Sequence, residues 1–172
     1  MSETPKSAAP SRALDTARAL DFARSELFER TFKEGMALVD ETAAYLDGPG
    51  RAASKRLSRA AALAYAGESM RLTTRLMQVA SWLLVQRAVR DGEMQLAEAG
   101  SEKYRLISRD VQPSPAFVGA DDLPEALKTL IIRARAVYER VRRLDETMYS
   151  ETEASLTNGV SDQMAKLKAA FG

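Results

Sequence analysis

The sequence predicts an all-α protein: an antiparallel three-helix bundle with a long central helix and flexible N- and C-terminal segments. Three observations support this fold class. Apolar side chains recur at spacings of three and four residues over long stretches. Glycine and proline fall between those stretches, where they are expected to end helices. The chain has 172 residues, 45% of them hydrophobic and 28% charged, which is enough for one domain with a real core.

The first helix is predicted over residues 12–47. Residues 1–11 before it are rich in serine, proline and alanine, so we expect them to be disordered. Either Ser11 or Asp15 can cap the N-terminus of this helix with a side-chain oxygen. The segment 47–50, with the sequence DGPG, ends it, because glycine readily leaves the helical conformation and proline cannot continue it.

The central helix is predicted over residues 51–91, and it is apolar on two faces. One face has apolar residues at helical spacing, namely Leu72, Leu76, Val79 and Leu83. The second face repeats every seven residues and consists of Leu63, Met70, Met77 and Leu84. A helix that is apolar on two sides needs neighbours on two sides. We therefore expect more than one partner helix to contact this segment.

The last third of the chain contains a connector, a third helix and a tail. Residues 93–122 are predicted to connect the helices and to be partly helical. A third helix is predicted over residues 123–149, capped by Asp121 or Asp122, because its apolar residues have the clearest three-four spacing in the chain. The pattern fades from residue 150, so residues 150–172 are predicted to be a mobile tail.

Composition argues against several functions. The chain has no cysteine and no histidine, which removes thiol chemistry, thiolate metal sites and the usual general base near neutral pH. It has no glycine-rich phosphate loop. We therefore predict that the protein is not an enzyme and has no cofactor and no metal site. The apolar segment 76–89 is too short for a membrane span, and the N-terminus lacks the apolar core of a signal peptide. We expect a cytoplasmic protein.

Charged residues on the helices are candidates for binding protein partners. On the central helix they stand three and four residues apart, a spacing at which an ordinary surface ion pair is the favoured alternative. The candidates are Arg30 and Lys33 on the first helix, Glu68, Arg71 and Arg75 on the central helix, and Arg135, Arg142 and Arg143 on the third. Trp82 is the only tryptophan. It is expected in the core, with an anchor in a dimer interface as the alternative.

Basic clusters suggest a second class of function, a structural or nucleoid-associated protein that binds DNA. The net charge is only +1, and no aromatic residues interleave with the basic ones to stack on bases. A solvated face, or a docking surface for an acidic protein, is therefore favoured over a nucleic-acid partner. The clusters are Arg51, Lys55, Arg56 and Arg59 at the start of the central helix, and Arg133, Arg135, Arg140, Arg142 and Arg143 on the third.

One stretch of the chain resembles a known family, the regulators of CtrA degradation or RcdA family. The resemblance lies in ESMRLTTRLMQ at residues 68–78, SWLL at 81–84 and QRAV at 86–89. The first helix adds shorter matches at Phe28, Phe32, EGM at 34–36, LV at 38–39 and YLD at 45–47. The resemblance covers residues 14–93 most strongly and contains no catalytic motif.

The resemblance implies a non-catalytic adaptor for regulated proteolysis in alphaproteobacteria. Such adaptors are helical bundles that dimerise. They help deliver cell-cycle regulators, including the transcription factor CtrA, to the ClpXP protease. They act with a response-regulator-like priming protein and a cyclic-di-GMP-binding effector, and they gather at a cell pole. No residue-level binding map follows from the resemblance.

Overall fold

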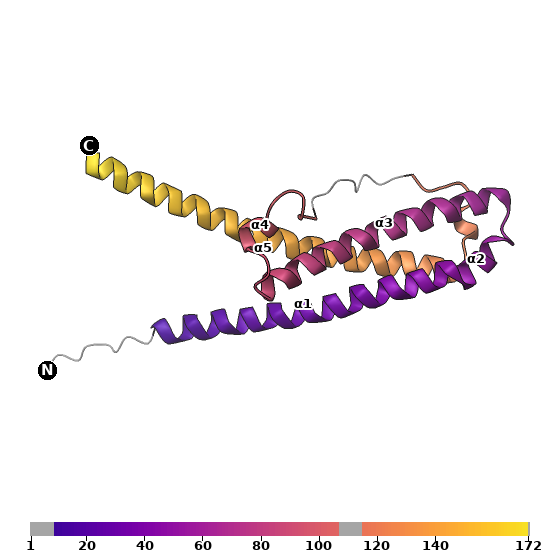
Figure 1. Cartoon of the computed structure of the whole chain (residues 1–172), viewed down its shortest axis with the longest axis horizontal. Helices are drawn as coiled ribbons and strands as arrows, with labels where there is room; N and C mark the ends of the chain where they lie inside the picture. The colour runs from indigo at the N-terminus through magenta and orange to yellow at the C-terminus, as the bar shows by residue number, and fades with distance from the viewer. Residues whose placement is uncertain (1–8, 107–114, 172) are drawn as a thin grey trace.

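A computed structural model describes the backbone of residues 9–106 and 115–171, and the side chains of residues 25–106 and 115–149. In these ranges the chain is helical and forms no strand. The elements are α1 (Ala9–Asp47), α2 (Pro49–Ser54), α3 (Arg59–Arg90), α4 (Leu96–Ala99), the 3-10 turn η1 (Ala120–Asp122) and α5 (Glu125–Phe171). The long helices α1, α3 and α5 pack side by side, with α3 in the centre of the chain (Figure 1). The predicted all-α three-helix bundle is confirmed.

The three long helices do not all alternate in direction. α1 runs antiparallel to α3, since Glu29 pairs with Arg90 while Gly35, further along α1, meets the earlier residue Leu83. It also runs antiparallel to α5, whose Arg133 and Arg140 pair with Glu41 and Glu34 of α1. α3 and α5 run parallel, because Trp82 and Gln86 of α3 both bond to α5 partners 63 residues later in the chain. A parallel neighbour needs a long return connection. The described parts of the segment between α3 and α5 lie at opposite ends of α3: α4 is near its C-terminal end (Figure 1), and Gly119, next to η1, contacts Ala60 near its N-terminal end.

The predicted helix over 51–91 is wrong at its beginning, because the chain breaks at residues 55–58 into α2 and α3. Ser58 causes the new start. Its backbone is extended, and its side-chain oxygen accepts a hydrogen bond from the Ala61 N–H at 3.2 Å. A serine one residue before a helix satisfies one of the N–H groups that have no helical partner. This capping serine is visible in the sequence, but the apolar periodicity on both sides of it favoured one continuous helix.

The predicted first and last segments of the chain differ from the structure. The helix predicted to end at residue 149 continues to Phe171. Apolar periodicity reports packing rather than helix formation, and residues 150–171 contain many alanine, leucine, glutamate and lysine residues with good helix propensity. The predicted disordered segment 1–11 lies outside the described residues, except that residues 9–11 begin α1. The connector is partly helical, as expected, with α4 and η1 inside it.

The core lies where one face of α3 meets both α1 and α5. The predicted first face of α3 is buried throughout, and the α5 residues Leu127, Ala134, Val137 and Val141 pack against it. The expectation that more than one helix contacts this segment is confirmed, because α1 and α5 both pack on α3. Among the described residues, however, no helix covers the second face of α3, whose four apolar residues are between 50% and 73% exposed. The exposed residues are Leu63, Met70, Met77 and Leu84, and we call them the α3 stripe.

Candidate interaction surfaces

A buried polar junction fixes the connector to the bundle. The Asp145 side chain on α5 is 3% exposed and accepts a hydrogen bond from the Trp82 Nε1–H at 2.7 Å. Its second oxygen accepts from Arg105 Nε at 3.0 Å, and the Arg105 guanidinium lies 4.6 Å from the ring centre of Tyr149. A buried carboxylate requires this kind of pairing, because an unpaired charge in the interior is costly. The residues that precede Leu106 are therefore held against α3 and α5.

A pocket lies beside this junction, between α3 and the connector. Its volume is about 620 Å³, and its floor includes the rings of Trp82 and Tyr138. Residues 102–106 form one wall. The opposite wall belongs to α3 and consists of Thr74, Met77, Gln78, Ser81 and Val85. This wall is the middle of a helix, whose backbone N–H groups are already used within the helix.

Four of the predicted partner-binding residues lie near one another on α3 and α5, and Arg75 links them to this pocket through the ring of Tyr138. Glu68 is buried and accepts a hydrogen bond from the Arg71 guanidinium at 2.9 Å. That guanidinium also lies 4.2 Å from the ring centre of Phe117. The Arg75 guanidinium lies 5.9 Å from the ring centre of Tyr138, which is part of the pocket. The fourth residue, Arg135 on α5, is exposed.

Positive charge dominates the electrostatics around these four residues. Burial lowers the pKa of Arg75, and the nearby charge of Arg135 lowers it further. Burial also raises the pKa of the Tyr138 hydroxyl. Glu68 is engaged by Arg71, and among the described residues neither Arg75 nor Arg135 forms an ion pair. We call Arg71, Arg75 and Arg135 the arginine niche.

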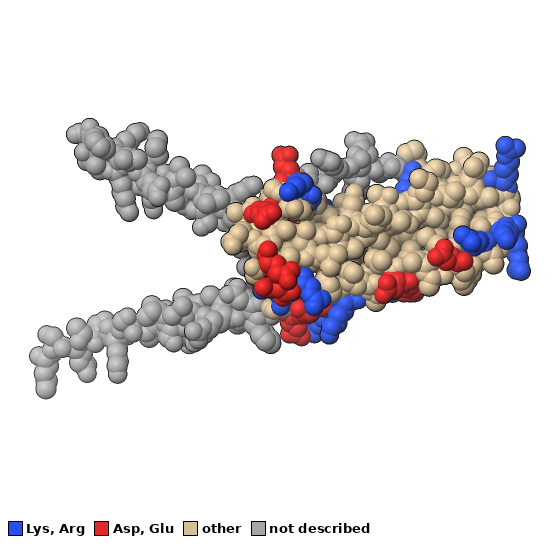
Figure 2. Space-filling model, viewed as in Figure 1, with Lys and Arg blue, Asp and Glu red and all other residues tan. Residues whose placement is uncertain are grey.

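The outer face of α3 forms a second candidate surface. Between residues 63 and 84, every exposed residue of α3 is uncharged. Figure 2 shows the result as a broad uncharged area across the middle of the bundle. A solvated helix normally carries charges on its outer face, so a surface of this kind indicates a contact with another protein. Its residues are the α3 stripe together with Ala66, Thr73, Thr74, Gln78 and Ser81.

The segments that flank α3 carry opposite charge, although the last turn of α3 itself contains Arg87 and Arg90, which pair with Asp91 and Glu29. At the α2 end, where Figure 2 shows Lys and Arg gathered, every charged side chain between residues 48 and 60 is basic and exposed. Beyond the C-terminus of α3, every charged side chain between residues 91 and 102 is acidic and exposed. The basic residues are Arg51, Lys55, Arg56 and Arg59, and the acidic ones are Asp91, Glu93, Glu98 and Glu102.

The remaining predicted site residues lie apart from the arginine niche. Arg30 is exposed on α1 and pairs with Glu26 at 3.0 Å, while the exposed Lys33 has no ion pair within the described residues. Arg142 bonds to two carboxylates of its own helix, Glu139 and Glu146, and Arg143 is exposed beside it. Trp82 is 1% exposed, so its ring lies in the core, where it borders the pocket described above.

The basic flank of α5 is largely neutralised by acidic side chains. Arg133 pairs with Glu41 of α1 at 2.7 Å, and Arg140 pairs with Glu34 of α1. Arg142 is also paired, so three of the five arginines of this flank are already engaged by carboxylates. The DNA-binding alternative therefore rests mainly on the exposed basic cluster at residues 51–59.

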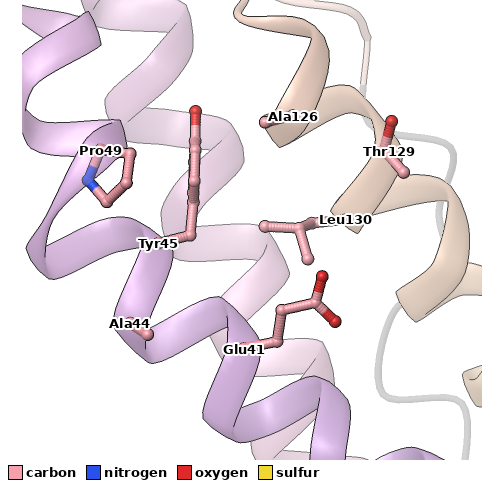
Figure 3. A pocket seen from close by; sticks show the side chains of 7 residues that line it. All are labelled: Glu41, Ala44, Tyr45, Pro49, Ala126, Thr129 and Leu130. Carbon is pink, nitrogen blue, oxygen red and sulfur yellow. The ribbon is translucent and has the colours of Figure 1, made fainter.

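A smaller pocket of about 360 Å³ lies between the end of α1 and the start of α5. Figure 3 shows Glu41 and Tyr45 of α1 on one side and Ala126, Thr129 and Leu130 of α5 on the other. The only charged group in it, Glu41, is already paired with Arg133. Nothing in this pocket suggests a chemical function.

Two searches of the described residues give negative results. No group of three or more acidic side chains is arranged to hold a metal ion. No helix in the described part of the chain is both long and apolar enough to cross a membrane.

Sequence reasoning missed Asp145, Arg105 and Phe117. Arg105 and Asp145 are 40 residues apart on different elements, so no local pattern relates them. Phe117 packs on Gly67 of α3, where a Cβ atom would come within 2.3 Å of its ring. The glycine inside a helical pattern was the signal for this close contact, but the sequence did not show what approaches it.

Comparisons with known proteins agree with the bundle fold. The profile of a family described as "Protein of unknown function (DUF1465)" matches residues 19–171. The chain is 61% identical to RcdA from Caulobacter crescentus CB15, for which a crystal structure exists. The similarity covers 73% of this chain and 94% of that chain, with a TM-score of 0.61. No curated protein matches the chain.

Proposed function

Because this chain belongs to the family described as DUF1465, and because it is 61% identical to RcdA, we propose that it is a non-catalytic adaptor in regulated proteolysis. It helps deliver cell-cycle regulators such as the transcription factor CtrA to the ClpXP protease through protein–protein contacts. It acts in the cytoplasm, with recruitment to a cell pole, together with a response-regulator-like priming protein and a cyclic-di-GMP-binding effector. The similarity to RcdA over 94% of that chain carries this proposal.

The surfaces of the bundle are compatible with this role. An adaptor needs two or more contact surfaces and no catalytic centre, because tethering works by raising the effective concentration of cargo near the protease. The charged outer face of α1 lies apart from the other two surfaces, whereas the α3 stripe borders the pocket beside the arginine niche through Met77. Modest affinity at each of them is enough for delivery.

Reconstituted proteolysis tests the adaptor role. Purified ClpXP, the priming protein, the cyclic-di-GMP effector and CtrA are combined with and without this chain, and CtrA is followed over time. We expect faster CtrA loss with the chain present. The double variant Arg30→Glu/Lys33→Glu should slow delivery while leaving the thermal midpoint nearly unchanged, because both side chains are exposed on α1. Equal CtrA lifetimes with and without the wild-type chain would reject the adaptor role.

The proposed function includes a homodimer. In this dimer, two copies of the chain pair through the α3 stripe. Apolar residues that recur every seven positions are typical of a seam between two helices. An antiparallel pair centred between Thr73 and Thr74 places Leu63 opposite Leu84 and Met70 opposite Met77. It also brings the basic segment before α3 of one copy beside the acidic segment after α3 of the other, whereas a parallel pair would place the like-charged segments together.

Substitution of the two central methionines tests the pairing. In the double variant Met70→Glu/Met77→Glu, four carboxylates would meet at the seam, so the dimer should dissociate. The fold should persist, because both residues are more than 60% exposed within one chain. Sedimentation velocity at several concentrations measures the change, and Ile132→Glu, on α5 and equally exposed at 66%, is the matched control. A wild-type chain that stays monomeric would reject the dimer.

Engineered cysteines test the orientation, and the absence of native cysteine makes the experiment simple. In the antiparallel arrangement, Thr74→Cys lies near the two-fold axis and should form a disulfide with its own copy. Leu63→Cys should not, because it faces Leu84 of the other chain. Efficient crosslinking of Leu63→Cys to itself would indicate a parallel dimer instead.

A further inference from the structure

We propose that the arginine niche and the pocket beside it bind a short peptide segment of a protein partner, one that carries an acidic side chain next to an apolar one. The carboxylate lies in the arginine niche, between Arg75 and Arg135, and the apolar side chain enters the adjoining pocket. This inference rests on the proposed adaptor function, because the peptide belongs to a protein that the adaptor carries or recruits.

The arginine niche is prepared for a carboxylate. Arg71 is held in place by its hydrogen bond to Glu68 and by the ring of Phe117, and Arg75 lies against Tyr138. A guanidinium whose orientation is fixed loses less entropy when it binds a carboxylate through two parallel hydrogen bonds. Arg75 is partly desolvated beside the charge of Arg135, and both effects lower its pKa. An added carboxylate would relieve that repulsion.

The pocket next to the niche supplies the apolar half of the site. Tyr138 belongs to both regions, since it lies against Arg75 and also lines the pocket. A volume of about 620 Å³ accommodates a large apolar side chain and its flanking backbone. The charged pocket residues that face this space are Glu102, Lys103 and Arg105, of which Arg105 is already paired with Asp145. Among the residues that the structure describes here, the charged groups without an ion pair are therefore the cations of Lys103, Arg75 and Arg135 and the carboxylate of Glu102.

The site fits a carboxylate better than a phosphate group. Phosphate sites in proteins commonly use backbone N–H groups at the N-terminus of a helix. The α3 and α5 residues of this site lie inside their helices, so those backbone groups are not available. The donors that remain are guanidinium and ammonium groups, together with the side chains of Thr74, Gln78 and Ser81. Acidic segments recognised by clustered arginines are a recurring mode of peptide binding.

Trp82 provides the measurement, because it is the only tryptophan and forms part of the pocket. Its fluorescence is followed while the full chain is titrated with a peptide of alternating glutamate and leucine. The same titration is made with the glutamine analogue of that peptide and with inorganic phosphate. We expect the glutamate peptide to bind about tenfold more tightly than the glutamine analogue, the loss expected when a charge-assisted pair is removed. Phosphate should leave the emission unchanged.

Variants locate the site. Arg75→Gln should weaken the glutamate peptide about tenfold, and Arg135→Gln, an exposed position whose change cannot unfold the bundle, should weaken it by a similar factor. Arg143→Gln removes the same charge from α5 outside the niche and should change the affinity less than about twofold. Equal binding of the two peptides, or an equal loss in Arg143→Gln, would overturn the proposal. So would an absence of binding up to about 1 mM peptide.

The peptide assay contains no protease, so its failure is distinguishable from failure of the proposed function. If Arg75→Gln abolishes peptide binding but CtrA delivery continues at the wild-type rate, the niche and its pocket are not the partner site and the adaptor role stands. If the wild-type chain binds the peptide but does not accelerate CtrA loss, the adaptor role fails and the binding site stands.

Discussion

Asp145→Ala is expected to lower the free energy of unfolding by about 3–5 kcal/mol, the usual cost of removing one partner from a buried ion pair. The Asp145 side chain is 3% exposed and the Arg105 side chain 19% exposed. Alanine would leave the Arg105 guanidinium and the Trp82 Nε1–H without their acceptor in the interior. Urea unfolding followed by far-ultraviolet circular dichroism measures the change.

Two further variants make this expectation specific. Glu146→Ala changes the next residue, which is exposed and paired with Arg142 on the surface, and it should alter stability far less. The double variant Asp145→Leu/Arg105→Met replaces both charges by apolar groups and should recover most of the lost stability, because no unpaired charge remains. If Asp145→Ala costs less than about 1 kcal/mol, the pair is not formed in solution.

The same pair determines whether the pocket exists. Arg105 lies in the connector, and its bonds to Asp145 hold residues 102–106 as the pocket wall opposite α3. Loss of Asp145 should therefore increase amide exchange in residues 102–106 before it affects the middle of α3. Stability, the connector and the proposed peptide site thus depend on one buried carboxylate.

The sequence predicted the helices better than their arrangement. Apolar spacing identified the buried face of α3, because a face that packs in a core must repeat with the helical period. The α3 stripe was recognised as apolar by the same criterion, but periodicity cannot tell whether the neighbour is another helix of the chain or another molecule. The parallel direction of α3 and α5 was missed because it depends on how the connector crosses the bundle.

The candidate sites show the same limit. Glu68, Arg71 and Arg75 were singled out because they stand three and four residues apart on one helix, and the structure brings Arg135 to them from α5. Neither Tyr138, within the predicted third helix, nor Phe117, within the predicted connector, was singled out from the sequence. Their rings complete the arginine niche, but this requires the parallel packing of α3 and α5 and the close approach at Gly67.

Leu83→Ala is expected to cost about 2–5 kcal/mol, the range for removing a buried leucine side chain and leaving a cavity. Leu83 is fully buried where α3 crosses α1. Its Cδ1 atom lies 2.7 Å from the position that a Cβ of residue 35 would occupy, so α1 carries glycine at the point of closest approach. Chemical denaturation measures the cost, and Ile132→Ala, at an exposed position on α5, should change stability by less than about 1 kcal/mol.

Gly35→Ala tests the same contact from the other helix. With leucine at position 83, the new methyl group would push Cδ1 aside. In the Leu83→Ala background that obstruction is gone, and the nearest remaining side-chain atoms, on Val79 and Val137, are at ordinary contact distances of 3.6 and 3.8 Å. The methyl group then fills part of the cavity and adds about 1 kcal/mol of helix propensity. The double variant should therefore be more stable than Leu83→Ala alone. A double variant that is less stable would show that α1 does not cross α3 at Gly35, and the packing that orients both faces of α3 would have to be revised.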